Sequence, residues 1–518
     1  MRYADSLPEA LYSADSVRAM DRYLIEEQGI DGFDLMQAAA RAGFRQLRKH
    51  WSSLGSLLVL CGAGNNGGDG YLIAANAQRL GIYVECVAVA PSSKLTGDAL
   101  RAFEAAKTES VPITEISDLA ERLLQEKLLA SDVIVDALLG TGVIGAPLAP
   151  FAEVIRAVNQ AKRPVLAVDL PSGLDASTGA AAGNVVQAEL TVTFIGAKAG
   201  LYTGMGPAVC GEVVFEPLAT HEQINGCSEQ PVARLARWRD CKAGFLPRPL
   251  NAHKGRFGHV LIVAGDFGFG GAGIMAAEAA SRAGAGLVSL ATRPEHVTAA
   301  LVRCPNVMVR GVVHGSELTT LIEQADVIVC GPGIGKSAWG QQMLQQVLRS
   351  TKPRVLDADA LNVMATRAAI PFGQHVLTPH PGEASRMLGC SVAEVEADRL
   401  VAAQKIQRIW GGVVLLKGAG TVIATGSEMP VVIAGGNPGM ATGGMGDVLS
   451  GMLGAFIGQL NDIGLSTVAA ASAHLTAGDK AAERLGYMAM LPTDVINDLP
   501  FVLKETDVIG VRNHREEE

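Results

Sequence analysis

A glycine-rich run that ends in an aspartate is the segment of this sequence with the clearest chemical potential. Six glycines lie from Gly435 to Gly446, and Asp447 follows directly, just before the apolar segment Val448–Leu453. We expect that segment to be helical, with the glycines on its entry loop and Asp447 in its first turn. Backbone N–H groups and the positive end of the helix dipole would then form an anion hole beside a carboxylate. This combination indicates proton removal from a hydroxyl while phosphate is held close by.

The glycine run before Asp447 and the segment Gly335–Ser337 both look like phosphate-binding motifs, and each also has a simpler interpretation. In the simpler interpretation, Asp447 does no more than stabilise a helix N-terminus, a position that aspartate favours. Six glycines, however, are more than a turn requires. The run Gly335-Lys336-Ser337 looks like the end of a P-loop. The glycine that a P-loop needs five residues before Gly335 is absent, because Cys330 occupies that position. We therefore favour the anion hole before Asp447 and exclude a P-loop.

Further candidates in the same half follow predicted strands. Lys417–Thr421 joins two strands through glycines and begins with a cation that suits phosphate oxygens. Thr378–Glu383 is expected to begin a helix, with Pro381 in its first turn. His380 and Glu383 would then lie at the N-terminus of that helix. Taken alone, His380 would more often be an ordinary loop histidine. The segments Gly331–Gly335 and Asp357–Leu361 also follow strands.

In the first half, the strand Leu57–Cys61 runs into a glycine loop, Gly62–Gly70, and then into a helix, Tyr71–Leu80. The glycines at 62, 64 and 67 formally satisfy G-x-G-x-x-G, so a dinucleotide-binding dehydrogenase must be considered. That motif is weak by itself. The expected acidic residue is poorly matched, because Glu85 lies inside the next strand, Tyr83–Ala90, rather than at its tip.

Two other strand ends of the first half carry oxygen ligands. Asp136 precedes a glycine loop, and Asp169 is followed shortly by Ser172. Polar groups at the carboxyl ends of parallel strands converge on one crevice. Carboxylate, amide and hydroxyl oxygens suit a hard cation, and the low ligand charge favours an alkali ion. Alternatively, Asp136 and Asp169 only cap loops. Lys198 follows another strand end and, as a lone lysine, is equally expected to be solvated.

The predicted elements that position these residues indicate an α/β fold in two parts. Their strands are continuous apolar runs, which is typical of parallel sheets covered by helices on both faces. The polar segment Thr220–Glu229 interrupts the pattern and is interpreted as a linker. Before the strand Leu57–Cys61 we expect two helices, Ser13–Gln28 and Leu35–Trp51. The other expected strands are Asp132–Leu138, Val165–Leu170, Leu190–Ile195 and Glu212–Phe215, then His259–Gly265, Gly286–Ala291, Asp326–Cys330, Arg354–Ala358, His375–Thr378, Val413–Lys417, Thr421–Thr425 and Val431–Ile433.

Composition narrows the class of protein. The 518 residues carry a formal charge of −9, which argues against a nucleic-acid partner. The eight cysteines contain no CxxC pair, and several lie in apolar runs, so we expect small buried hydrophobes in a reducing compartment. The N-terminal residues contain no signal-like apolar block, and the apolar runs are short and broken by glycine. We expect a soluble cytoplasmic protein without a membrane partner; a homo-oligomer is compatible with the sequence.

The first half resembles the NAD(P)H-hydrate epimerase family through Gly62–Gly70, Asp136–Gly142 and Val168–Gly173. The resemblance implies a Rossmann-like three-layer αβα domain over residues 1–219. It also implies that Asp169 is the acid/base, with Lys198 nearby, and that K⁺ is held by Asn66, Asp136 and Ser172. The substrate-binding residues that it implies are Asn65, Asn66, Gly67, Gly68, Asp69, Gly140, Thr141, Gly142, Val143, Ile144, Gly145, Ala146 and Asp169.

The second half resembles the ribokinase-like superfamily and, within it, the NAD(P)H-hydrate dehydratases. The matching motifs are His253–Gly255, Gly331–Gly335, Thr378–Glu383 and Gly436–Asp447. This resemblance implies a three-layer αβα domain over residues 234–505, after a linker at 220–233 and before a charged tail at 506–518. It implies a catalytic Asp447. The other residues that it implies are Ala272, Gly333 and His380 for substrate, with Asp447, and Lys417, Gly418, Ala419, Gly420, Thr421, Asn437 and Gly446 for nucleotide.

An epimerase half followed by a dehydratase half is the fused arrangement found in bacteria. It implies repair of hydrated NADH and NADPH: epimerisation of the R and S hydrates, then Mg²⁺-assisted dehydration of the S form at the expense of ADP, giving NAD(P)H, AMP and phosphate. The fusion favours ADP over ATP. Two alternatives stay open, a small-molecule hydroxyl kinase with a dinucleotide-binding domain and a non-enzymatic nicotinamide-dinucleotide sensor. A plain kinase has no use for Gly62–Gly70 and Asp136.

Overall fold

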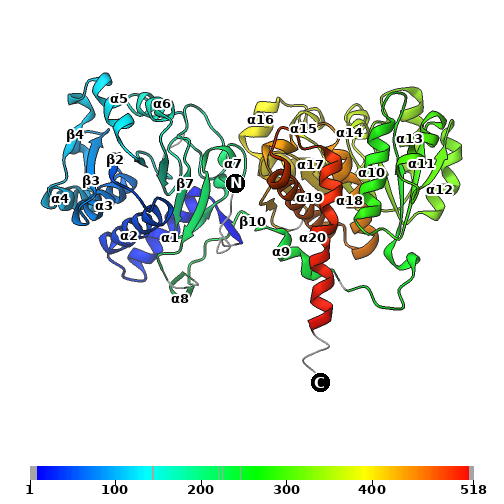
Figure 1. The fold of residues 1–518 in the computed structure, drawn as a ribbon, viewed down its shortest axis with the longest axis horizontal. Helices are drawn as coiled ribbons and strands as arrows, with labels where there is room; N and C mark the ends of the chain where they lie inside the picture. Colours follow the sequence, from blue (N-terminus) through cyan, green and yellow to red (C-terminus); the bar gives the residue numbers. More distant parts are fainter. Residues whose placement is uncertain are drawn as a thin grey trace. The chain divides into compact units, whose positions relative to one another are not determined.

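A computed structural model describes residues 9–142, 145–219, 221–224, 226–245, 247–426 and 428–512. The chain divides into two compact units, Met1–Arg234 and Leu235–Glu518, and each contains a sheet with flanking helices (Figure 1). The expected α/β class, with mainly parallel sheets, is confirmed. Val143, Ile144 and Thr220, which the sequence analysis placed in a substrate loop or in the linker, lie outside the described residues, as do residues 513–518 of the expected tail.

The sheet of the first unit is parallel throughout, in the order β4-β3-β2-β5-β6-β7-β9. Every strand expected in this half is present, with ends shifted by one or two residues. The three-residue edge strand β4 was not predicted, because it has no apolar run of its own. The strands are β2 (Ser56–Cys61), β3 (Tyr83–Ala88), β4 (Ile113–Glu115), β5 (Val133–Ala137), β6 (Val165–Val168), β7 (Leu190–Phe194) and β9 (Glu212–Glu216).

Helices cover both faces of this sheet, which explains its continuous apolar strands. Along β2, Leu57 and Val59 pack in one buried cluster and Leu58 and Leu60 in another, because successive side chains point to opposite faces. The first cluster includes α1 (Ala14–Glu26), α2 (Gly32–His50), α3 (Asn65–Arg79) and α4 (Gly97–Thr108), and the second includes α5 (Glu121–Ala130) and α6 (Phe151–Ala161).

The glycine-rich run after β2 differs from the prediction. We expected a loop up to Gly70 and a helix from Tyr71, but α3 already begins at Asn65. The glycines serve close packing: a Cβ at Gly67 would lie 2.1 Å from the carbonyl oxygen of Gly62, and one at Gly70 would lie 2.6 Å from the Cβ of Ala137. Asn65 and Asp69 are therefore side chains of one helix rather than of a flexible loop.

The segment predicted as a linker carries some regular structure. It contains the short helix α8 (His221–Ile224), and β10 (Ala233–Ala236) begins at its end. The first two residues of β10 pair antiparallel with β1 (Ala10–Tyr12), which also pairs with β8 (Ala197–Lys198). None of these three short strands was predicted.

The sheet of the second unit runs β13-β12-β11-β14-β15-β16-β17-β18-β19. It is parallel from β13 to β17, and β18 and β19 are added antiparallel. Only the exposed strand β13 was not predicted. The strands are β11 (His259–Val263), β12 (Leu287–Thr292), β13 (Met308–Gly311), β14 (Val327–Cys330), β15 (Arg354–Leu356), β16 (His375–Leu377), β17 (Val413–Leu416), β18 (Thr421–Ala424) and β19 (Val431–Ile433).

Helices also lie on both faces of the second sheet. Val260, Ile262 and Val329 belong to a large cluster with α10 (Gly270–Arg282), α18 (Met445–Leu460), α19 (Ile463–Leu485) and α20 (Pro492–Arg512). The alternating residues of the same strands face α12 (Leu318–Gln324), α13 (Ala338–Arg349) and α17 (Arg399–Trp410), which contact β11, β14 and β17. Residues 506–512, expected to start a charged tail, belong to α20.

The burial of the cysteines and the hydropathy of the helices bear on two expectations from composition. Six of the eight cysteines are buried, and the other two, Cys227 and Cys390, are partly buried. This agrees with their interpretation as small hydrophobic side chains. Among the helices of the described residues, none is both long enough and apolar enough to cross a membrane.

Candidate active sites of the two units

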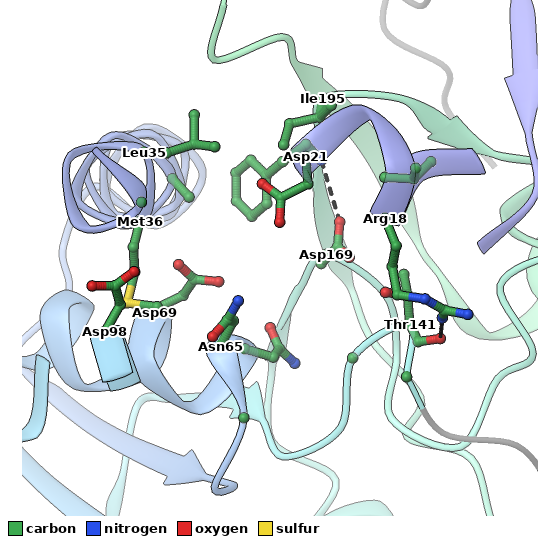
Figure 2. A pocket seen from close by; sticks show the side chains of 18 of the residues that line it. Arg18, Asp21, Leu35, Met36, Asn65, Asp69, Asp98, Thr141, Asp169 and Ile195 are labelled. Carbon is green, nitrogen blue, oxygen red and sulfur yellow. Dashed lines mark hydrogen bonds between the residues drawn. The ribbon is translucent and has the colours of Figure 1, made fainter. Parts of the chain in front are cut away.

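The first unit contains a cavity of about 750 Å³ at the carboxyl ends of its central strands. Figure 2 shows its walls, which come from α1, α2, α3 and the loops after β5 and β6. Of the residues expected to bind substrate, it brings together Asn65, Asn66, Asp69, Gly140, Thr141, Gly142 and Asp169, and Lys198 also lines it. Gly67 and Gly68 are instead buried within α3, and Gly145 and Ala146 are exposed and do not line the cavity.

Asp169 and Lys198 form a tight ion pair in this cavity. The Lys198 side chain is 1% exposed, so the alternative of a solvated surface lysine is wrong. Its Nζ donates to the Asp169 carboxylate, to Thr193 Oγ1 at 3.0 Å and to the Phe194 carbonyl at 3.0 Å. Asp169 has a φ of +70°, a conformation that is uncommon for a non-glycine residue and that is found more often at functional sites. The pair places a fixed cation against a carboxylate that faces the cavity.

The residues expected to hold K⁺ converge beside this pair. Ser172 donates from its backbone N and its Oγ to Asp136, at 2.8 and 2.6 Å, and burial raises the pKa of Asp136 to about 6. Asn66 Nδ2 and Ser172 Oγ both donate to the Leu139 carbonyl, at 3.1 and 3.3 Å. The buried Oδ1 of Asn66 has no hydrogen-bond partner, which is costly unless a ligand satisfies it. This orphaned oxygen fits an oxygen-liganded monovalent cation.

In the second unit, Asp447 lies in the first turn of α18, where it was predicted. The helix starts after Gly444, whose φ of +101° suits glycine. The glycine run is ordered from its other end, because Asn437 accepts from Gly439 N at 3.0 Å and donates to Asp479 at 2.9 Å. Burial, helped by nearby carboxylates, raises the pKa of Asp447 to about 7. That value suits a general base at neutral pH.

An ion pair between the buried Asp357 and the partly exposed Lys417 lies under the start of α18. Lys417 Nζ donates to Asp357 Oδ1 at 2.6 Å, and Ser450 Oγ donates to Oδ2 at 2.8 Å. Burial alone would raise the pKa of Asp357, but the Lys417 ammonium and the hydrogen bonds lower it below its usual value. A Cβ at Gly446 would lie 3.2 Å from Lys417 Nζ and 3.3 Å from Asp357 Oδ2. Lys417, expected to face nucleotide phosphate, is thus held by Asp357 next to the glycine run.

The glycine turn after Lys417 is held by a residue that sequence reasoning missed. Arg399 on α17 is 1% exposed, and its Nη2 donates to the carbonyls of Leu416 and Lys417, at 3.3 and 3.0 Å. A Cβ at Gly418, where φ is +140°, would lie 2.8 Å from that nitrogen. The turn therefore requires glycine at this position and has a fixed shape. No motif marks Arg399, because its contacts depend on how α17 packs.

Two further predicted residues, His380 and Ala272, lie at helix starts. His380 caps α15 (Pro381–Leu388): its Nδ1 accepts from Gly382 N at 3.0 Å, and Glu383 accepts from His380 N at 2.9 Å. Burial raises the pKa of Glu383 to about 7. At the start of α10, a Cβ at Gly333 would lie 3.2 Å from that of Ala272, so these two predicted substrate residues are neighbours.

The glycine loop that contains Gly333 is connected to the acidic group around Asp447. Gly335 N donates to Asp359 Oδ2 at 3.0 Å, and the charge of Asp359 contributes to the raised pKa of Asp447. Ser337 serves a structural role, since its Oγ caps α13 through Gly340 N and donates to Asp266 at 2.6 Å. This agrees with the exclusion of a P-loop here.

We expect Asp357→Asn to destabilise the second unit by about 3–5 kcal/mol, because it leaves the Lys417 charge without its carboxylate. The measurement is the free energy of unfolding from urea titration. Adding Lys417→Met to Asp357→Leu removes both charges and should recover a large part of the loss. If Asp357→Asn lowers the free energy of unfolding by less than about 1 kcal/mol, the pair contributes no more than an ion pair on the protein surface. That result would contradict its structural role.

Comparisons with known proteins match each half of the chain to a family. The family model of NAD(P)H-hydrate dehydratase matches residues 260–500, and that of the YjeF-related protein N-terminus matches residues 32–200. A structure of a hypothetical protein from Streptococcus mutans superposes on the chain with a TM-score of 0.50 at 33% identity, covering 53% of this chain and 99% of its own.

Two curated relatives extend over nearly the whole chain. The bifunctional NAD(P)H-hydrate repair enzyme of Coxiella burnetii is 42% identical over 489 residues, covering 94% of this chain and 98% of its own. That of Escherichia coli is 41% identical over 518 residues, covering 99% and 97%. The chain belongs to the family of bifunctional NAD(P)H-hydrate repair enzymes.

Proposed function

We propose that the first unit interconverts the R and S hydrates of NADH and NADPH, and that the second dehydrates the S form at the expense of ADP, releasing NAD(P)H, AMP and phosphate. The observation that carries the proposal is Asp447, a half-buried carboxyl group with a pKa of about 7 in the first turn of α18. It lies beside a glycine run and the Lys417–Asp357 pair. The relatives described above are named as bifunctional NAD(P)H-hydrate repair enzymes.

The chemistry of the hydrate explains why an epimerase is needed. Its hydroxyl is on the ring carbon C6, next to the ring nitrogen, whose lone pair can expel that oxygen. We assign Asp169, with Lys198, to move protons as the C6–O bond opens and re-forms on the other face. The cavity walls hold the ring in place during this exchange. The proposed substrate contacts are Asn65, Asn66, Asp69, Gly140, Thr141 and Gly142, which line the cavity with Asp169.

A monovalent cation would assist by orienting oxygens of the ligand. Asn66, Asp136 and Ser172 are the side chains that would hold it, and the unpartnered Oδ1 of Asn66 supports this assignment. The ion would neutralise part of the charge of the buried Asp136 carboxylate. Potassium is proposed because only one of these ligands carries a charge.

In the second unit, Asp447 removes the proton of the C6 hydroxyl, whose oxygen then attacks the terminal phosphate of ADP. N–H groups of Gly443–Gly446 stabilise the charge that develops on the transferring group. AMP leaves first; loss of phosphate from C6 and of a proton from C5 then restores NAD(P)H. The contacts proposed for nucleotide are Lys417, Gly418, Ala419, Gly420, Thr421, Asn437 and Gly446, and for substrate Ala272, Gly333 and His380.

Magnesium would neutralise phosphate charge when it is bound. It usually needs only one or two carboxylates besides substrate phosphates, and Asp359, close enough to act on the pKa of Asp447, is available. Within the described residues no three His, Cys, Asp or Glu side chains form a metal-binding group.

We expect epimerisation to depend on K⁺, because the cation satisfies Asn66 Oδ1 and offsets the Asp136 charge. The rate should rise when K⁺ replaces choline in the buffer, and the melting temperature of the first unit should rise with it, since ligand binding stabilises the folded state. Asp136→Asn should abolish both effects while dehydration continues at the wild-type rate. Equal rates and melting temperatures with and without K⁺ would contradict the cation site.

Asp447→Asn should lower ADP-dependent dehydration by about 10²–10⁴-fold, because it removes the general base but keeps the size of the side chain. Nucleotide binding, measured by calorimetry, and epimerisation should change little. The wild-type rate should rise with pH through about 7, as Asp447 loses its proton. If the variant dehydrates the hydrate at a rate within a few-fold of wild type, Asp447 only stabilises the start of the helix, and the proposed mechanism is refuted.

A further inference from the structure

Helix α1 forms a wall of the cavity in the first unit that sequence reasoning did not predict. Arg18, Asp21 and Arg22 line the cavity from this helix, and Figure 2 shows Asp21 on the same side as Asp169. Arg18 fixes the helix in place, because its Nη1 donates to the Thr141 carbonyl at 2.5 Å. The helix precedes residues 32–200, the segment matched by the YjeF-related family model. The packing of α1 against the cavity brings its side chains into the site, although the helix lies outside the segment that the family model matches.

The balance of charge in the cavity is unequal. Four carboxyl groups, of Asp21, Asp69, Asp98 and Asp169, line it together with the guanidinium groups of Arg18 and Arg22 and the ammonium of Lys198. That ammonium is bonded to Asp169, whereas within the described residues Asp21 has no ion pair or hydrogen bond through its side chain. Burial raises the pKa of Asp21, the charge of Asp169 raises it further, and Lys198 partly opposes them. Its surroundings thus favour the protonated form of Asp21.

We infer that Asp21 is a second acid–base residue of the epimerase site, acting as the proton donor while Asp169 acts as the acceptor. The inference rests on the proposed epimerisation and adds a residue to it. Pairs of carboxyl groups whose surroundings favour opposite protonation states are a recurrent way of dividing acid and base roles.

The reaction needs both roles, because the hydroxyl leaves as water only if it gains a proton. The proton of Asp21 passes to the C6 hydroxyl oxygen, the C6–O bond breaks with both electrons going to oxygen, and the ring nitrogen shares the positive charge. Water adds to the other face of C6 and loses its proton to Asp169. The proton returns from Asp169 to Asp21 through solvent, so that each turnover consumes nothing.

Asp21→Asn tests the inference, with Glu26→Gln as the matched control. Glu26 is an exposed carboxylate on the same helix and does not line the cavity. The epimerisation kcat should fall by about 10²–10⁴-fold in Asp21→Asn, with KM changed only a few-fold, and Glu26→Gln should match wild type. Asp21→Glu should recover part of the rate. The melting temperature of the first unit reports whether each variant is folded.

The pH profile separates a chemical role from a structural one. Since the donor must be protonated, the wild-type kcat should decline as pH rises through the raised pKa of Asp21, and Asp21→Asn should lack this decline. Asp69→Asn is measured in parallel, because burial also raises the pKa of Asp69. The charged groups that line the cavity around Asp21 are Arg18, Arg22, Asp69, Asp98, Asp169 and Lys198.

An unchanged kcat in Asp21→Asn would overturn the inference. So would a reduced kcat that keeps the alkaline decline, or a decline lost in Asp69→Asn but not in Asp21→Asn. Wild-type protein that fails to epimerise the hydrates in the same assay would instead refute the proposed function, and the role of Asp21 with it.

Discussion

A lysine whose ammonium is held by a carboxylate at the end of a parallel strand is the constraint on which both sites depend. An ammonium removed from water is stable only when a carboxylate and further oxygens accept its protons. The buried Lys198 is held in this way by Asp169, Thr193 and Phe194, and the partly exposed Lys417 is held by the buried Asp357. Each pair fixes the position of the loops at the strand ends. Each also places in the site one carboxylate whose charge is balanced by the lysine ammonium.

Further carboxyl groups lie beside these pairs and have raised pKa values. Burial raises the pKa of Asp447 and of Glu383 to about 7, and it raises that of Asp21 as well. A group that exchanges a proton near neutral pH can act as acid or base without a large energetic cost. In the proposed mechanism, a lysine-paired carboxylate and a neighbouring carboxyl group with a raised pKa lie in each unit, for proton transfer at a carbon–oxygen bond in the first and for activation of a hydroxyl in the second.

The sequence predicts what depends on local pattern. Continuous apolar runs located nearly all strands of both sheets, and the glycine run placed Asp447 in the first turn of its helix. Short edge strands such as Ile113–Glu115 carry too little pattern to be recognised. The glycines of Gly62–Gly70 suggested a loop, since spacing alone does not distinguish a flexible turn from a helix that packs closely on its strand.

Tertiary contacts account for the rest of what was missed. The burial of Lys198, the guanidinium of Arg399 against the turn at Gly418, and the position of Asp21 depend on how helices pack onto the sheets. Lys417 was assigned to phosphate from its place before a glycine turn, and its bond to Asp357 joins residues 60 positions apart. Such pairings have no signature in a single sequence.

The central claim is that two separate sites act in turn on the same hydrate. The most direct measurement follows NADH formation from a mixture of R and S hydrates with ADP, using wild-type protein and Asp169→Asn. Wild type should convert both epimers in one continuous phase. The variant should convert the S epimer at the wild-type rate and leave the R epimer to disappear only at its uncatalysed rate. Rapid conversion of both epimers by Asp169→Asn would contradict the account.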